Sequence, residues 1–248
     1  MKKSLLISVA VLVIAGAIYG YHQFNKEKIY LEKDVKCDFD AGICYDLKGK
    51  PITGRILNYE NKILISDISY VNGKEDGNLK IYNNDGKLFL EGTYAQGKPH
   101  GYVKEYNEDG TLYSYDEFKN GIQHGKSIIY QANNVPVKEW YYDMGKEVNT
   151  GKVYYENGTP QLEINFTQKE LKYYYPNNKI QTHAHFNDSG YHGAWTSYNK
   201  DGQITAQLEF ENGKGKSGYC LNKDNQKQEF AEQDFITFVQ TNKTPCDK

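Results

Sequence analysis

The stretch "YNEDGTLYSYDEFKNGIQHG" (residues 106–125) places a Tyr four residues before an Asp-Gly turn, a Phe eight residues after it, and another Gly further on. The same spacing returns along the chain. Successive turn residues are 24 positions apart, except for one step of 20. They are Lys62, Gly86, Gly110, Asn134, Gly158, Asn178 and Gly202. A fixed period of this length is typical of a repeat protein.

Two aromatic columns keep step with the turns. A Tyr stands four residues before the turn at Tyr82, Tyr106, Tyr130, Tyr154, Tyr174 and Tyr198. An aromatic residue stands eight residues after it at Tyr70, Tyr94, Phe118, Tyr142, Phe166, Phe186 and Phe210. Between turn and aromatic, alternate positions are mostly apolar, as in Leu162, Ile164 and Phe166. Since this alternation is that of a half-buried strand, each unit is predicted to be a β-hairpin.

Composition agrees with this architecture. The chain has 23 Tyr and 23 Gly but only two Met, which favours short strands and turns over a helical bundle. We therefore predict an all-β fold: an elongated, twisted antiparallel meander of about seven 24-residue hairpin repeats, preceded by an N-terminal hydrophobic helix. Because twisted open sheets seldom exceed about 10 strands, this sheet should coil or cover its apolar face.

Four segments follow from these patterns. Residues 1–24 read as a signal peptide or signal anchor and 25–53 as a linker with an N-terminal cap. The hairpin array is predicted for 54–215, and 216–248 as a C-terminal cap. Helical spacing of Phe230, Phe235 and Phe238 in that cap indicates a short helix over the last hairpin.

The N-terminal segment predicts export. Lys2 and Lys3 precede an apolar run from Leu5 to about Tyr21, which orients the N-terminus toward the cytoplasm. Two outcomes stay open. An uncleaved run would anchor the protein in the inner membrane with the repeats in the periplasm or outside, whereas cleavage after "AGA" (residues 15–17) would release it into the periplasm. Either way the predicted location is the cell envelope.

The four cysteines fit an oxidising compartment. Two of them precede the repeats and two follow them. The most economical hypothesis joins Cys37 to Cys44 and Cys220 to Cys246, so that each end of the array is closed by a disulfide.

Two segments together carry a family resemblance: "NGKEDGNLKIYNNDGKLFLEGTYAQGKPHGYVKEYNEDGTLYSYDEFKNGIQHG" (residues 72–125) and "YHGAWTSYNKDGQITAQLEFENG" (residues 191–213). They resemble the MORN-repeat variant of the YwqK family of toxin–antitoxin antitoxins, over roughly residues 45–215. The resemblance implies a sheet of hairpins that binds or neutralises another protein, such as a toxin, and implies no catalytic residue. The export signal and the cysteines differ from a cytosolic antitoxin, which favours a partner in the envelope or an incoming toxin.

The sequence offers no candidate catalytic residues. The chain has no G-x-S-x-G, H-E-x-x-H, C-x-x-C or phosphate-loop motif, so we predict neither an enzyme nor a cofactor. The net charge of −2 gives no basic face for nucleic acid. His183 and His185 alternate on one strand and could share a metal, but no third ligand is near in sequence. An exposed polar pair is therefore favoured, and no metal site is predicted.

The positions five and seven residues past each turn face away from the apolar side. In stacked hairpins they would form an acidic and aromatic stripe, which suits protein recognition. Its candidate partner-binding residues are Glu91, Tyr115, Glu117, Glu139, Tyr141, Glu163, His183 and His185. The other interpretation is that they only pair across strands on a hydrated face. We expect a non-catalytic interaction module, with a structural, self-associating envelope protein as the alternative.

Overall fold

The computed structural model describes residues 27–131 and 134–246. The predicted signal or anchor and its helix lie outside these residues. In the described part of the chain, no helix is long and apolar enough to span a membrane. The chain divides into an N-terminal unit, up to residue 87 with 93–98, and a C-terminal unit, 88–92 with 99–248. The segment boundaries drawn from the sequence stay predictions.

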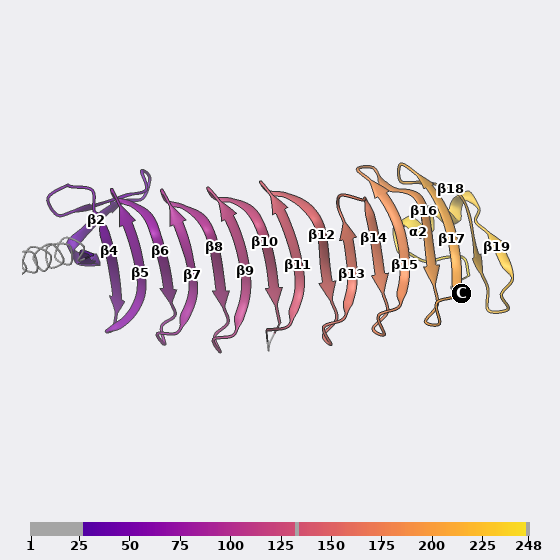
Figure 1. Cartoon of the computed structure of the whole chain (residues 1–248), viewed down its shortest axis with the longest axis horizontal. Helices are drawn as coiled ribbons and strands as arrows, with labels where there is room; N and C mark the ends of the chain where they lie inside the picture. Colours follow the sequence, from indigo (N-terminus) through magenta and orange to yellow (C-terminus); the bar gives the residue numbers. More distant parts are fainter. Residues whose placement is uncertain (1–26, 132–133, 247–248) are drawn as a thin grey trace, which may run out of the picture. The chain divides into compact units, whose positions relative to one another are not determined.

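The N-terminal unit is a small sheet with a disulfide-closed hairpin against it (Figure 1). Strand β1 pairs in parallel with β4, and β4, β5 and β6 pair antiparallel in chain order. Tyr30, Cys44, Ile52, Ile56 and Tyr70 form its buried core. The elements are β1 (Ile29–Leu31), η1 (Glu32–Asp34), β2 (Val35–Asp38), β3 (Ile43–Asp46), β4 (Gly54–Glu60), β5 (Ile63–Val71) and β6 (Lys74–Tyr82).

The C-terminal unit confirms the predicted antiparallel meander, since from β8 to β19 each strand pairs antiparallel with the next. Strand β7 (Leu88–Ala95) is divided between the two units. The others are β8 (Lys98–Tyr106), β9 (Leu112–Lys119), β10 (Ile122–Tyr130), β11 (Pro136–Asp143), β12 (Lys146–Tyr154), β13 (Pro160–Asn165), β14 (Glu170–Tyr174), β15 (Ile180–Asn187), β16 (Gly190–Tyr198), β17 (Ile204–Glu211), β18 (Lys214–Leu221) and β19 (Lys227–Glu229).

The turn columns of the sequence are turns in the structure. In the turn between β8 and β9, Gly110 has φ 87° and donates its N–H to the carbonyl of Asn107, 2.9 Å away. In the turn at the other end of β9, Asn120 (φ 53°) and Gly121 (φ 81°) are consecutive left-handed residues. Two such residues make a type I′ turn, whose twist matches that of the flanking strands.

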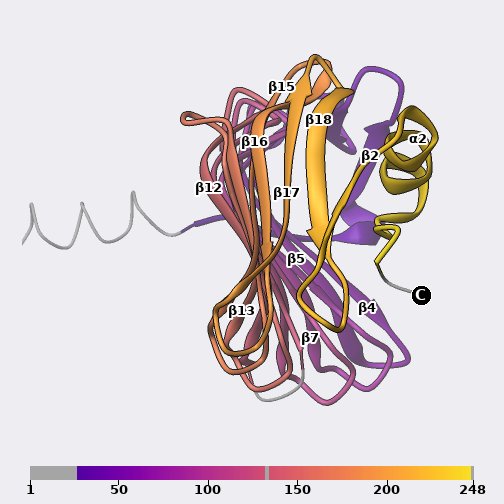
Figure 2. The same cartoon turned by 90° about the vertical axis from the view of Figure 1, so that its right-hand side faces the viewer.

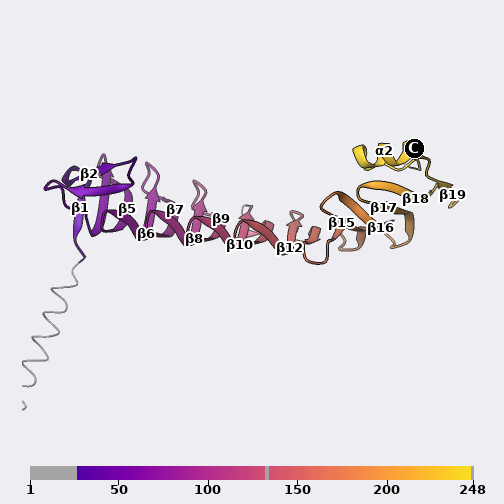
Figure 3. The same cartoon turned by 90° about the horizontal axis from the view of Figure 1, so that it is seen from above.

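One face of the sheet carries the core at its C-terminal end. Helix α2 (Glu232–Thr241) forms a second layer there beside β17 and β18 (Figures 2 and 3). The buried cluster consists of Ala184, Trp195, Ala206, Leu208, Phe210, Cys220, Phe235 and Phe238. Further from the helix, apolar residues of the same face, such as Leu162 and Ile164, are only half-buried. The helix therefore completes the core for the last strands.

Both disulfides have the predicted pairing. Cys37 bonds Cys44 across the β2–β3 hairpin, and Cys220 on β18 bonds Cys246 after the helix. All four cysteines are thereby used, and none is a free thiol. Each bond closes a cap, one in each unit.

Candidate partner-binding surface

A single row of side chains crosses the C-terminal unit on the face opposite the core. Residues directly opposite one another in paired strands project to the same side of a sheet. Following these pairs from β8 to β18 defines what we call the polar row. Its members are Lys104, Tyr115, Ile128, Glu139, Lys152, Glu163, Lys172, His183, Thr196, Gln207 and Tyr219.

The charges in the middle of the polar row alternate in sign. Glu139, Lys152, Glu163 and Lys172 come from four successive strands, each opposite the next. Lys152 Nζ lies 2.8 Å from Glu163 Oε1. Cross-strand pairs of opposite charge stabilise a sheet by roughly 0.2–1 kcal/mol each. The alternation therefore contributes to the stability of a face that no helix covers in the described part of the chain.

Glu139 gathers three donors. The Nζ of Lys126 lies 3.0 Å away, and the hydroxyls of Tyr141 and Tyr154 donate to the carboxylate at 2.8 and 3.2 Å. Burial alone would raise the pKa of Glu139, but hydrogen bonds from Lys126 and Tyr141 outweigh it and hold that pKa below its ordinary value. The carboxylate is thus charged and fixed in orientation.

The same arrangement recurs along the array. Glu163 accepts from the hydroxyl of Tyr174 at 2.8 Å, and Tyr115 donates to Glu117 at 2.7 Å. Burial, reinforced by the neighbouring carboxylate, raises the pKa of Tyr115 to about 12, so its hydroxyl stays a donor. Glu91 accepts from Tyr106 at 2.9 Å and pairs with Lys104 at 3.1 Å. Tyrosines and glutamates on this face therefore hold one another in defined positions.

The structure brings several of the predicted stripe residues into contact. Tyr115 bonds Glu117, Tyr141 bonds Glu139, and the rings of His183 and His185 lie 5.1 Å apart. Most are half-buried; His185 is exposed. Sequence reasoning missed the lysines that pair with the glutamates, and it missed the second role of the Tyr column before each turn. That column supplies hydroxyls to the glutamates through Tyr106, Tyr154 and Tyr174.

The remaining described histidines have a structural role. Nδ1 of His100, His124 and His192 lies 3.3, 3.4 and 3.3 Å from the backbone N of Asn120, Met144 and Asn212, respectively. Each acceptor is 20 residues from its donor, so the contact repeats at equivalent turns. The His-Gly pair at the end of residues 106–125 is thereby explained: the imidazole accepts from the first residue of a neighbouring type I′ turn.

The lowered glutamate pKa values predict acid sensitivity. Glu139 and Glu163 have pKa values below the ordinary 4.5 in the folded chain, so their contribution to stability is complete above that pH. It is lost as the pH falls through the lowered folded values. We expect the melting temperature to drop on acidification below 4.5, with a smaller drop in Glu139→Gln. Melts of both proteins followed by circular dichroism check this, and parallel pH profiles would contradict it.

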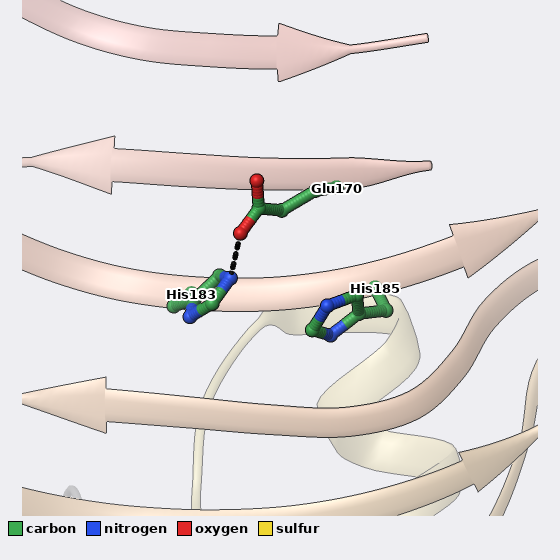
Figure 4. A group of neighbouring side chains, drawn as sticks. All are labelled: Glu170, His183 and His185. Atoms are coloured by element: carbon green, nitrogen blue, oxygen red, sulfur yellow. Dashed lines mark hydrogen bonds and ion pairs between the residues drawn. The ribbon is translucent and has the colours of Figure 1, made fainter. Parts of the chain in front are cut away.

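A second group lies on the same face. Glu170 on β14 and His183 and His185 on β15 bring one ligand atom each within 4.8 Å of one another (Figure 4). His183 Nε2 is hydrogen-bonded to Glu170 Oε1, and Lys172 Nζ lies 3.1 Å from the same oxygen. Among the described residues, this is the group of His, Cys, Asp and Glu side chains whose spacing could hold a metal ion.

Comparison with known proteins identifies the repeats. The MORN repeat variant matches residues 75–96, 99–120, 148–168, 167–188 and 191–212. The chain therefore carries MORN-type repeats. No curated protein matches it.

Two solved structures align with part of this chain at low sequence identity. A mutant of S. aureus TarM, in complex with Fondaparinux, alpha-GlcNAc-glycerol and UDP, is 12% identical over 57% of this chain, with a TM-score of 0.19. This chain spans 22% of that protein's length. A protein of unknown function from Bacteroides fragilis NCTC 9343 is 9% identical over 63% of this chain and 90% of its own, with a TM-score of 0.11.

Proposed function

We propose that this repeat protein is a non-catalytic module that binds a partner protein through the polar row of its C-terminal unit. The observation that carries the proposal is the preorganised set of tyrosines and glutamates around Glu91, Glu139 and Glu163. The MORN-type repeats support it, because equivalent positions of stacked repeats form extended binding surfaces.

Rigid side chains favour recognition. Tyrosine is enriched at protein interfaces because it offers a large contact area at low entropic cost. Side chains already held by Tyr–Glu and Lys–Glu bonds lose little further freedom when a partner docks. Tyr113, 44% exposed and two residues before Tyr115 in β9, adds an aromatic surface that a partner can cover.

The finer form of the proposal is an antitoxin- or immunity-type protein exported to the cell envelope. The two disulfides support an oxidising location, and the resemblance of the repeats to the YwqK family supports a toxin as partner. Both the anchored and the cleaved form of the N-terminal segment are compatible with it.

Cross-linked affinity purification of the tagged full chain from its native cells, read by mass spectrometry, tests the proposal. We expect one foreign protein in stoichiometric amount, and a toxin among such partners would support the immunity role. Recovery of the chain alone, or only of its own oligomers, would contradict partner binding and favour a structural, self-associating envelope protein.

A further inference from the structure

We propose that Glu170, His183 and His185 form a binding site for a divalent transition-metal ion, with Zn²⁺ as the expected occupant. Glu170 lies directly opposite His185 in the β14–β15 pairing, and Lys172 lies opposite His183. All three ligands therefore project from the same face, as Figure 4 shows. This inference does not depend on the proposed partner binding.

The donor set fits zinc. Two imidazoles and one carboxylate make a common three-residue zinc site, which leaves a fourth position for water or for a ligand from outside the chain. No cysteine competes for the ion, because all four are in disulfides. Zinc bonds of about 2.0–2.2 Å in a tetrahedron separate the ligands by roughly 3.3 Å. The observed donors, within 4.8 Å of one another, need only side-chain rotations to close around an ion.

The ligand side chains are partly accessible to solvent and are oriented by their neighbours. The His183 and Glu170 side chains are 30% and 18% exposed. His185 Nδ1 lies 3.4 Å from the carbonyl oxygen of Ala194. A proton on Nδ1 that points to this carbonyl leaves Nε2 with the lone pair that a metal requires.

Glu170 is already bonded to two neighbours, His183 and Lys172. An ion bound here would replace the hydrogen bond between His183 and Glu170. It would also face the Lys172 ammonium, now 3.1 Å from the carboxylate. The Lys172 ammonium therefore competes with the metal ion for the Glu170 carboxylate.

Isothermal titration of ZnCl₂ into the untagged full chain tests the site. We expect one Zn²⁺ per chain. His183→Ala, His185→Ala and Glu170→Gln should each weaken binding by at least ~10-fold, a loss comparable to removal of groups that orient a metal ligand. His124→Ala is the matched control, because it removes an imidazole of β10 that makes a turn contact, 3.4 Å from the backbone N of Met144, and should leave the affinity unchanged.

Lys172→Met is expected to increase the affinity for Zn²⁺. A misfolded variant would lose affinity, so misfolding cannot produce this result. Removal of the competing ammonium should tighten Zn²⁺ binding by roughly 3- to 10-fold. The proposal is overturned if the full chain shows no saturable binding, or if binding survives the Glu170, His183 and His185 substitutions. It is also overturned if Lys172→Met binds no more tightly than the unchanged chain.

Discussion

Phe238→Ala should lower the free energy of unfolding of the C-terminal unit by about 3–5 kcal/mol, the range for removal of a buried Phe side chain. Phe238 is 1% exposed on α2 and its ring centre lies 4.8 Å from that of Trp195 and 6.0 Å from that of Phe210. Its loss leaves a cavity between the helix and the sheet. Urea denaturation of the full chain, followed by circular dichroism and tryptophan fluorescence, measures the change.

Val239→Ala is the control for Phe238→Ala. Val239 is the next residue of the same helix and is 54% exposed, so its truncation should change stability by less than about 0.5 kcal/mol. Equal losses in the two variants would show that α2 is not packed on the sheet through Phe238.

Reduction of the Cys220–Cys246 disulfide should be the second large effect. The two cysteines are 26 residues apart, and the loop-entropy model assigns closure of such a loop about 3.5 kcal/mol. For Cys37 and Cys44, separated by seven residues, the same model gives about 2.5 kcal/mol. The loss arises mainly because the unfolded chain regains freedom, and α2 should detach most readily.

Two double variants separate these contributions. Cys220→Ala with Cys246→Ala should be the less stable, and Cys37→Ala with Cys44→Ala the more stable, when each is denatured without reductant. Cys220 is 1% exposed, so part of its loss reflects packing; reduction of the unchanged chain measures the bond alone. A reduced chain as stable as the oxidised one would contradict the role given to the C-terminal disulfide.

The repeat and its turns could be predicted from sequence because they depend on local chemistry. Gly110 and Asn120 occupy left-handed backbone conformations that few other residues tolerate, so the turn columns are visible as letters. The cysteine pairing was also predictable, since each pair flanks the array and the nearest partners are the ones that bond.

The metal-ligand group could not be predicted, because it depends on strand register. His183 and His185 are visible as an alternating pair, but Glu170 is 13 residues before His183 and meets it only through the pairing of β14 with β15. Glu170 lies in the one repeat that is 20 residues long instead of 24. The 24-residue spacing therefore does not show which residue of this repeat lies opposite His183 or His185. Knowledge of the strand pairing, which sets Glu170 opposite His185, would have indicated the third ligand.

The polar row was only partly predictable, because some of its residues depend on strand pairing as well. The columns past each turn gave Glu139 and Glu163, but Lys126 and Lys152 stand on the returning strands, outside those columns. Sequence therefore predicted an acidic and aromatic stripe, whereas pairing across strands makes the centre of the row alternate in sign.

A charge swap within the polar row tests the central claim most directly. The double variant Lys152→Glu with Glu163→Lys keeps an ion pair at the position where the two charges now lie 2.8 Å apart, but reverses the order of charges that a partner meets. The swap also sets a carboxylate opposite Glu139 and an ammonium opposite Lys172, and it removes the hydrogen bond from Tyr174 to Glu163. Because opposed like charges destabilise a sheet, the melting temperature should fall by a few degrees while the chain stays folded. Glu163→Lys alone, which places an ammonium between Lys152 and Lys172 with no carboxylate partner in the row, serves as the destabilised control.

The decisive comparison is the amount of partner that the unchanged chain and this double variant capture from native cells, measured by quantitative mass spectrometry after cross-linking. If the polar row is the binding surface, the folded double variant loses most of the captured partner. Equal capture by the two proteins would contradict the assignment of partner binding to this face.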